Sequence, residues 1–324
     1  MADWSKSIKG KARKDRYENP TSTSLKGMAD LLRWSLTEKR TPWPRWVEKV
    51  MPSQVPKDLM APGEIRCFMI NHATLLIQTS EGNILTDPVF SERVSPFSWA
   101  GPRRRKAPGL KLDQLPKIDL VLISHNHYDH MDVASLHSIW RKHDPVFLLP
   151  LKNFHHLFNA EIFSTRALEL DWWQRTEVHP QLKVTLVPAQ HWSSRSFQDR
   201  NLSLWGGFWI EVGKKKIYFA GDTGYADLFR VMQEKLGSPD LALLPIGAYE
   251  PRWFMRNQHM NPEEAVQAHL DLQAGKSVGI HWGTWPLTNE GIEQPLQDLQ
   301  KALEKLMVSK DRFVALDNGE HLAI

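Results

Sequence analysis

Short apolar runs recur along the chain from residue 64 to the C-terminus, separated by turn-forming residues. Runs of four to eight residues are typical of buried strands, whereas amphipathic helices are longer and have a 3.6-residue period. The pattern therefore predicts strands at 65–70, 74–78, 83–86, 118–123, 145–149, 184–188, 204–212, 216–220, 241–246, 277–280 and 312–316.

Helical spacing appears in four other stretches, at 24–36, 133–141, 261–270 and 294–306. The third begins with Asn261-Pro262-Glu263-Glu264, which combines a capping residue, a proline in the first turn and a glutamate three residues after the cap. Strands, a helix and strands thus follow one another twice. We expect an α/β domain at 63–324 whose two similar halves, 64–180 and 181–324, meet at one site.

Residues 1–62 form a separate basic segment that contains tryptophans and prolines. Its first 40 residues carry ten Lys or Arg and five Asp or Glu, while the remaining 284 have a net charge of −1. This positive excess suits an anionic partner, either a membrane surface or nucleic acid, and it suits a solvated or disordered tail equally. In the helix predicted at 24–36, Leu25, Met28, Leu32 and Leu36 would either dock on the following domain or lie on a membrane.

Composition narrows the class of protein further. Of 324 residues, 41% are hydrophobic and 24% charged, as in soluble globular proteins, and no apolar run approaches the ~20 residues of a membrane span. Cys67 is the single cysteine, so any metal must be held by nitrogen and oxygen ligands. The charged N-terminus lacks an apolar signal-peptide segment. We expect a cytoplasmic protein, with peripheral membrane attachment as an option.

The stretch Ser124-His125-Asn126-His127-Tyr128-Asp129-His130 carries the strongest chemical signal. It places four metal-ligand side chains within six positions, directly after the strand predicted at 118–123. A helix cap alone would not require three imidazoles and a carboxylate. Open α/β sheets bind ligands at the carboxyl ends of their strands, so this turn predicts a metal site.

Three further predicted strands deliver ligand-type residues at or soon after their carboxyl ends, namely His191, Asp222 and His281. Seven ligands exceed the three or four that one tetrahedral zinc ion takes, but they suit two ions sharing a carboxylate. We assign three histidines to the first ion, three residues to the second and Asp222 to the bridge between them. The two sets are His125, His127 and His191, and Asp129, His130 and His281.

Two ions about 3.5–4 Å apart can hold a shared hydroxide as the nucleophile and neutralise charge that develops in the transition state. We expect Asp129 and Asp222, which hold these ions, to be the catalytic carboxylates. Asp87 follows a strand and precedes a proline, so it either orients a ligand histidine or simply forms a turn. Zinc suits the histidine-rich first site, and iron or manganese would accept the same ligands.

A long loop at 91–115 carries the cluster Arg103-Arg104-Arg105-Lys106. Loops of this length are often functional. The cluster would attract a phosphate group or form a solvated surface, and the sequence does not decide between the two.

At these residues the chain resembles the metallo-β-lactamase superfamily. Thr86-Asp87-Pro88, the His125–His130 turn, His191, Asp222 and His281 follow the order of its motifs. Within it, the chain is most similar to the N-acylphosphatidylethanolamine-hydrolysing phospholipase D group. The most specific stretch is Pro245-Ile246-Gly247-Ala248-Tyr249-Glu250-Pro251-Arg252-Trp253-Phe254-Met255, and others are 169–173, 221–225 and 281–284.

The resemblance implies an αβ/βα sandwich with a site for two Zn²⁺, and hydrolysis of a phospholipid to an N-acylethanolamine and phosphatidic acid. It also implies that Tyr128 and His259 contact the substrate. Taken alone, Tyr128 is plausible because it lies in the ligand turn, whereas His259 lies in a loop without such a signal.

Other functions remain open at this stage. The same site could serve a nuclease, a lactonase or a cyclic phosphodiesterase, or hold a non-hydrolytic di-iron centre. Nucleases of this superfamily usually carry an extra RNA-holding insertion, which this sequence lacks, so we expect no nucleic-acid partner. Di-iron relatives typically have Glu at the position of His127. A homodimer is a further expectation, for which the sequence carries no direct signal.

Overall fold

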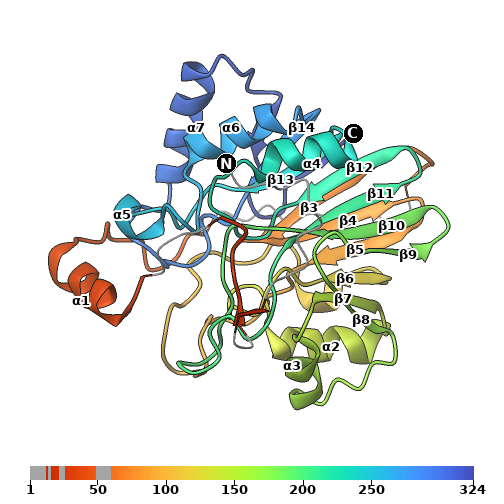
Figure 1. Cartoon of the computed structure of the whole chain (residues 1–324), viewed down its shortest axis with the longest axis horizontal. Coiled ribbons are helices and arrows are strands. Elements are labelled where there is room, and N and C mark those ends of the chain that lie inside the picture. The colour runs from red at the N-terminus through yellow and green to blue at the C-terminus, as the bar shows by residue number, and fades with distance from the viewer. Residues whose placement is uncertain (1–11, 14–15, 22–25, 49–59) are drawn as a thin grey trace.

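Two β-sheets packed face to face form the centre of the molecule, with helices on both outer surfaces (Figure 1). This computed structural model describes residues 12–13, 16–21, 26–48 and 60–324. The expected αβ/βα sandwich is confirmed. The functional side chains come from one end of the two sheets, where several strands finish.

The first sheet has seven strands in the order β16-β3-β4-β5-β6-β7-β8. Strands β5, β6, β7 and β8 run parallel to one another, so their carboxyl ends lie at one edge of the sheet. The bounds are β3 Arg66–Asn71, β4 Thr74–Thr79, β5 Gly82–Thr86, β6 Leu120–Leu122, β7 Val146–Pro150, β8 Ala167–Leu170 and β16 His321–Ala323.

The second sheet also has seven strands, in the order β15-β14-β13-β12-β11-β10-β9. Strands β12 to β15 are parallel, and β9 to β12 are antiparallel neighbours. The bounds are β9 Arg175–His179, β10 Leu182–Val187, β11 Gly207–Val212, β12 Lys215–Phe219, β13 Leu241–Pro245, β14 Lys276–Ile280 and β15 Phe313–Ala315.

Three apolar layers hold the sandwich together. The middle layer lies between the sheets, and the two outer layers join each sheet to its helices. Burying both faces of each sheet explains why the strands appear in the sequence as continuous apolar runs. The helices are α2 Val133–His143 and α3 Phe154–Asn159 on the first sheet, and α4 Leu228–Leu236, α6 Pro262–Asp271 and α7 Gln294–Lys305 on the second.

Most elements predicted from the apolar runs are present, but the predicted division of the domain at residue 180 does not match the two sheets at two places. Strand β9 precedes the predicted boundary at residue 180, yet it pairs with β10 of the second sheet. Strand β16 pairs with β3 of the first sheet, although it is the last strand of the chain. In the domain after residue 60, the elements that we did not predict are α3, α4, β8, β9, β16, the short helix α5 Arg252–Met255 and the 3-10 helix Leu112–Gln114.

The N-terminal segment packs on the sandwich through a few anchors. Its described elements are β1 Ala12–Arg13, β2 Arg16–Tyr17 and α1 Met28–Thr37. In α1, Trp34 is buried and its indole nitrogen donates a hydrogen bond to Asn289. Leu32 and Leu36 are instead 61% and 75% exposed, and Leu25 lies outside the described residues. The helix therefore docks through its tryptophan rather than its leucines.

No helix in the described part of the chain is both long and apolar enough to span a bilayer.

Candidate metal centre

The turn between β6 and α2 carries four of the seven predicted ligands. The amide groups of His130 and Met131 both donate to the carbonyl of His127, which closes the turn tightly. Gly221 allows the turn that carries Asp222 to lie close to the turn between β6 and α2. The φ of Gly221 is +59°, and a Cβ at Gly221 would lie 2.5 Å from the Cβ of Ser124. A glycine is needed there because an L side chain would clash.

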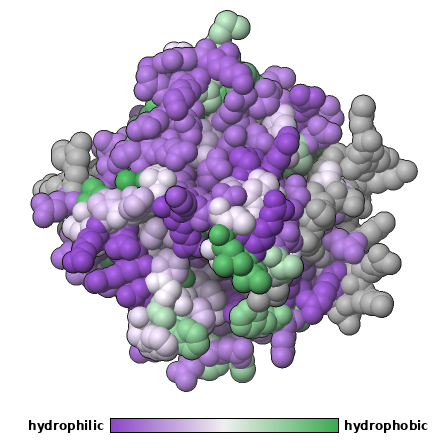
Figure 2. Space-filling view, turned by 90° about the vertical axis from the view of Figure 1, so that its left-hand side faces the viewer, coloured by the Kyte–Doolittle hydropathy of each residue, from purple (hydrophilic) through white to green (hydrophobic). Residues whose placement is uncertain are grey.

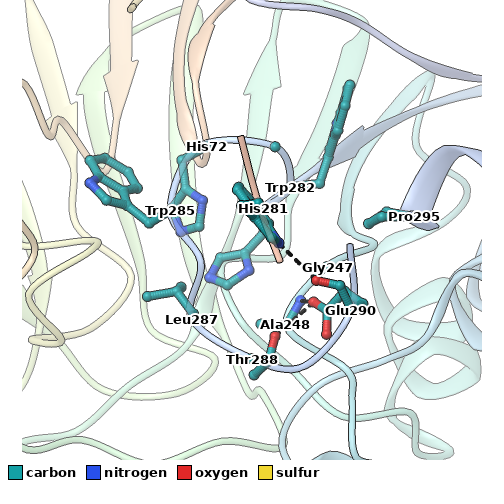
Figure 3. A pocket seen from close by; sticks show the side chains of 12 residues that line it. His72, Gly247, Ala248, His281, Trp282, Trp285, Leu287, Thr288, Glu290 and Pro295 are labelled. Atoms are coloured by element: carbon teal, nitrogen blue, oxygen red, sulfur yellow. Dashed lines mark hydrogen bonds between the residues drawn. The ribbon is translucent and has the colours of Figure 1, made fainter. Parts of the chain in front are cut away.

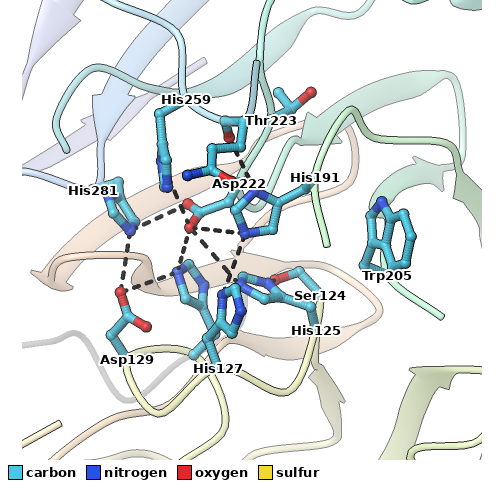
Figure 4. Close-up of polar contacts among 12 residues, drawn as sticks. Ser124, His125, His127, Asp129, His191, Trp205, Asp222, Thr223, His259 and His281 are labelled. Carbon is cyan, nitrogen blue, oxygen red and sulfur yellow. Dashed lines mark hydrogen bonds and ion pairs between the residues drawn. The ribbon is translucent and has the colours of Figure 1, made fainter. Parts of the chain in front are cut away.

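One group of ligand atoms comes from His125, His127, His191 and Asp222, and these atoms all lie within 4.8 Å of one another. His125 and His127 belong to the turn after β6, whereas His191 follows β10 and Asp222 follows β12. The Nε2 atom of His191 lies 3.3 Å from Nδ1 of His127. The first ligand set predicted from the sequence is thus brought together from both sheets (Figure 4).

A second group contains His72, Asp129, His130 and His281. Oδ2 of Asp129 lies 3.3 Å from Nε2 of His281 and 3.7 Å from Nε2 of His130. His281 directly follows β14, so this group also joins the two halves. It contains all three residues predicted for the second ion, together with His72, which we did not predict.

Asp222 lies between the two groups (Figure 4). Its Oδ2 atom is 3.2 Å from Nε2 of His130 and 3.7 Å from Nε2 of His191. Its Oδ1 atom is 3.2 Å from Nε2 of His281. A carboxylate that faces histidines of both groups is in the place that a bridging ligand requires.

Burial and neighbouring charges shift the pKa values of these histidines. Burial lowers the pKa of His127 to about 3 and that of His191 to about 4, so both rings are neutral and offer a lone pair. Burial opposes a charge on His281 as well, but Asp222 and Asp129 raise its pKa to about 9. Positive charge is therefore favoured where the second ion would bind.

The donor atoms present fit a pair of divalent ions. Nε2 of His130 and of His281 is buried and makes no aligned hydrogen bond within the described chain, although Asp222 lies 3.2 Å from each. Buried polar atoms without partners are costly unless a cation satisfies them. Five imidazoles and two carboxylates form a nitrogen- and oxygen-rich set suited to Zn²⁺, Fe or Mn.

Asp87 lies behind the second group. Its Oδ2 atom is 2.6 Å from Nδ1 of His130, and it accepts hydrogen bonds from the amide and hydroxyl groups of Ser124. The carboxyl group is fully buried. This contact is the one expected of a residue that orients a ligand histidine, since it leaves Nε2 of His130 facing the site.

The two predicted substrate contacts lie at the edge of the centre. Tyr128 donates its hydroxyl hydrogen to the carbonyl of Arg195, whose guanidinium group lies 4.0 Å over the tyrosine ring. Nδ1 of His259 is 3.9 Å from Oδ2 of Asp222, and its ring centroid is 5.1 Å from that of His191. The structure therefore brings His259 to the centre from a loop that carried no local signal.

Two residues that contact the centre were not predicted from the sequence. His72 carries a ligand-type side chain, but it stands alone in the turn 71–73. The side chain of Asn19 accepts from the amide of His191 at 3.0 Å and donates to its carbonyl at 2.7 Å. Nothing in the local pattern distinguishes Asn19, because its partner is 172 residues away.

The basic cluster at 103–106 is neither a phosphate site nor a solvated surface as a whole. Arg104 and Lys106 are 4% and 5% exposed. Arg104 donates to the carbonyls of Val89 and Ser91, and Lys106 is paired with Asp317. Two of the four cations are thus structural, because a buried cation must be satisfied by hydrogen-bond acceptors or an ion-pair partner.

The chain is similar to known proteins in sequence and in fold. The model of a family described as the beta-lactamase superfamily domain matches residues 82–282. The chain is 38% identical over 290 residues to N-acyl-phosphatidylethanolamine-hydrolyzing phospholipase D 1 of Caenorhabditis elegans, an alignment that covers 84% of this chain and 81% of that protein.

A second relative is the mitochondrial N-acyl-phosphatidylethanolamine-hydrolyzing phospholipase D of Saccharomyces cerevisiae. It is 37% identical, and the alignment covers 68% of this chain but only 48% of the yeast protein. Among solved structures, the metallo hydrolase Igni18 of Ignicoccus hospitalis has a TM-score of 0.60 at 22% identity, covering 81% of this chain and 98% of that one. The last comparison concerns the fold alone.

Proposed function

The chain belongs to the beta-lactamase superfamily and to its N-acylphosphatidylethanolamine-hydrolysing phospholipase D-like group, and from this premise we propose that it hydrolyses N-acylphosphatidylethanolamine-type phospholipids. The products would be an N-acylethanolamine and phosphatidic acid. It is a metal-dependent hydrolase, and we propose two Zn²⁺ as its cofactors. The substrate assignment rests on the 38% identity, over an alignment that covers 84% of this chain, to N-acyl-phosphatidylethanolamine-hydrolyzing phospholipase D 1 of Caenorhabditis elegans.

The proposed residue roles follow from the two ligand groups. A bound pair of divalent ions would supply an acidified water as nucleophile and positive charge for the phosphate oxygens. His125, His127 and His191 would hold one ion, and Asp129, His130 and His281 the other. Asp222, whose Oδ2 atom lies 3.7 Å from Nε2 of His191 and 3.2 Å from Nε2 of His130, would keep the two ions together.

A cavity beside the centre offers room for part of the substrate. It has a volume of about 580 Å³ and lies against Tyr128. Its walls combine serines with charged groups, including Glu92, Arg93 and Arg195. This lining suits a polar headgroup and its phosphate better than an acyl chain, because buried charged groups are costly next to hydrocarbon.

The loops around this cavity expose large aromatic side chains. Phe97 is 53% exposed, Trp99 is 76% exposed and Phe197 is 97% exposed. These residues neighbour the cavity-lining Ser98 and Arg195 in the sequence. The face that carries α1 shows apolar groups among hydrophilic ones (Figure 2). Aromatic rings are favoured at a lipid–water interface, so we propose that these loops contact the lipid surface from which substrate is drawn.

The substrate assignment is tested with metal-loaded protein and vesicles that contain N-acylphosphatidylethanolamine. We expect release of N-acylethanolamine, measured by mass spectrometry. A parallel panel contains a cyclic phosphodiester, RNA and a lactone. Two ions per chain with no acylethanolamine released would refute the proposal, and turnover of a panel substrate would identify the alternative. Visible absorption typical of a di-iron centre would argue for redox chemistry.

The lipid contact has its own test. We expect a variant with Phe97→Ser, Trp99→Ser and Phe197→Ser to bind phosphatidylcholine vesicles less in sedimentation assays. The control replaces Phe158 and Phe163, which are 58% and 57% exposed but line no wall of this cavity. Equal binding by the triple variant and the control would contradict the proposed surface.

A further inference from the structure

His72 reaches the metal centre from a hairpin that carries no predicted ligand. It lies in the turn between β3 and β4, with a left-handed φ of +48°. Its side chain is only 2% exposed, and Nε2 lies 3.2 Å from Oδ2 of Asp129. A residue other than glycine in this backbone region is uncommon and costs free energy, so such positions are concentrated at functional sites.

The same turn also holds His281. The carbonyl of His72 accepts the amide hydrogen of His281 at 2.8 Å. The ring centroids of these two histidines are 3.9 Å apart, and the rings lie side by side (Figure 3). His72 therefore contacts two members of the second ligand group, one from each half of the sandwich.

A second layer of side chains fixes the His72 ring in place. Trp285 packs edge-on against it, with ring centroids 5.1 Å apart (Figure 3). The guanidinium group of Arg104 lies 4.8 Å over the Trp285 ring on its way to the carbonyls of Val89 and Ser91. The buried Arg104 side chain thus packs against Trp285, which in turn restricts the His72 ring.

We propose that His72 is a positioning residue that donates its Nε2–H to the Asp129 carboxylate and so sets the affinity for the second metal ion. A neutral imidazole has one N–H, and a hydrogen bond of this kind fixes the orientation and basicity of the ligand that accepts it. In this proposal His72 acts as the donor rather than as a ligand, because an Nε2 atom that carries hydrogen cannot also bind a metal. The proposal depends on the metal centre but not on the identity of the substrate.

Two substitutions separate the donor from the ring. His72→Phe keeps an aromatic ring against His281 and Trp285 but lacks the N–H group. His72→Gln lacks the ring but keeps an amide donor near the position of Nε2. The control is His269→Phe, since the whole residue is 3% exposed in both His269 and His72, and His269 bonds Ser277 outside the centre.

Metal binding is measured by chelator competition and by counting ions per chain, with Co²⁺ absorption as a spectroscopic signature. We expect His72→Phe to weaken binding of one ion about 10- to 100-fold and to leave the other within a few fold. His72→Gln should bind both ions within a few fold of the natural chain, as should His269→Phe. Thermal unfolding recorded on the same samples separates lost metal affinity from lost stability.

Three results would overturn the proposal. If His72→Phe binds both ions normally, the hydrogen bond to Asp129 does not control the second site. If His72→Gln is as defective as His72→Phe, the imidazole nitrogen is a direct ligand instead. If His269→Phe loses an ion too, the effect is a general response to replacing a buried histidine. None of these readouts uses phospholipid turnover, so the proposed substrate can fail independently.

Discussion

Replacing Asp222 with asparagine removes one negative charge from the middle of the metal centre and hardly changes side-chain volume. The carboxylate is 2% exposed, with Oδ2 3.2 Å from Nε2 of His130 and Oδ1 3.2 Å from Nε2 of His281. At that distance, two unit charges interact by about 5 kcal/mol at an effective dielectric constant of about 20. A divalent ion held there would lose still more, because its charge is larger.

We therefore expect Asp222→Asn to lose at least one ion at metal concentrations that saturate the natural chain. Activity, measured as kcat/KM, should fall by at least about 10³-fold, which corresponds to about 4 kcal/mol of transition-state stabilisation. The far-UV circular dichroism spectrum should not change, because the carboxylate supports the ligand groups rather than the core between the sheets.

The assay combines metal counting with turnover of the lipid substrate. Asp271→Asn is the matched control, since Asp271 has a side chain 6% exposed and pairs with Arg230 away from the centre. It should keep both ions and near-normal turnover. If Asp222→Asn retains activity within a few fold while two ions stay bound, the bridging assignment is wrong.

Three further outcomes follow from the same geometry. Asp87→Asn should weaken metal binding about 10- to 100-fold in chelator competition, because the contact at 2.6 Å orients His130, and unchanged affinity would contradict this role. Chelator treatment should lower the free energy of unfolding, measured in denaturant, by up to about 4 kcal/mol per ion relative to protein kept at a free metal concentration 1,000-fold above Kd. An unchanged free energy of unfolding would argue against tight metal sites. Burial lowers the pKa of His269 from 6.5 to about 4, so its contribution to stability is present above pH 6.5 and is lost as the pH falls to 4. Between these pH values, the free energy of unfolding from denaturant titrations should change with pH less steeply in His269→Phe than in the natural chain. The difference should be up to about 1.4 kcal/mol per pH unit.

Several features of this protein were accessible from local sequence. The His125–His130 turn stands out because its ligands are consecutive, and His191, Asp222 and His281 stand out because each follows a buried apolar run. Parallel strands place their carboxyl ends at one edge, so residues at those positions are expected to meet. The helix cap at Asn261 was also predicted from local sequence, and the Asn261 side chain accepts a hydrogen bond from the amide of Glu264.

Other features depend on contacts between segments far apart in the chain. His72 and Asn19 carry no local pattern, yet one lies 3.2 Å from Asp129 and the other holds the backbone of His191. The cluster 103–106 was expected either to attract a phosphate group or to form a solvated surface, and only the folded loop shows Arg104 buried against Trp285.

The sequence by itself determined the fold class and indicated the candidate metal-ligand side chains, because hydrophobic period reports local burial and residue type reports ligand chemistry. Only the tertiary structure decided which strands belong to which sheet, as β9 and β16 show. It also decided which residues stand behind the ligands. The physical reason is that sheet order and side-chain packing arise from pairings across the whole chain, and no single stretch encodes them.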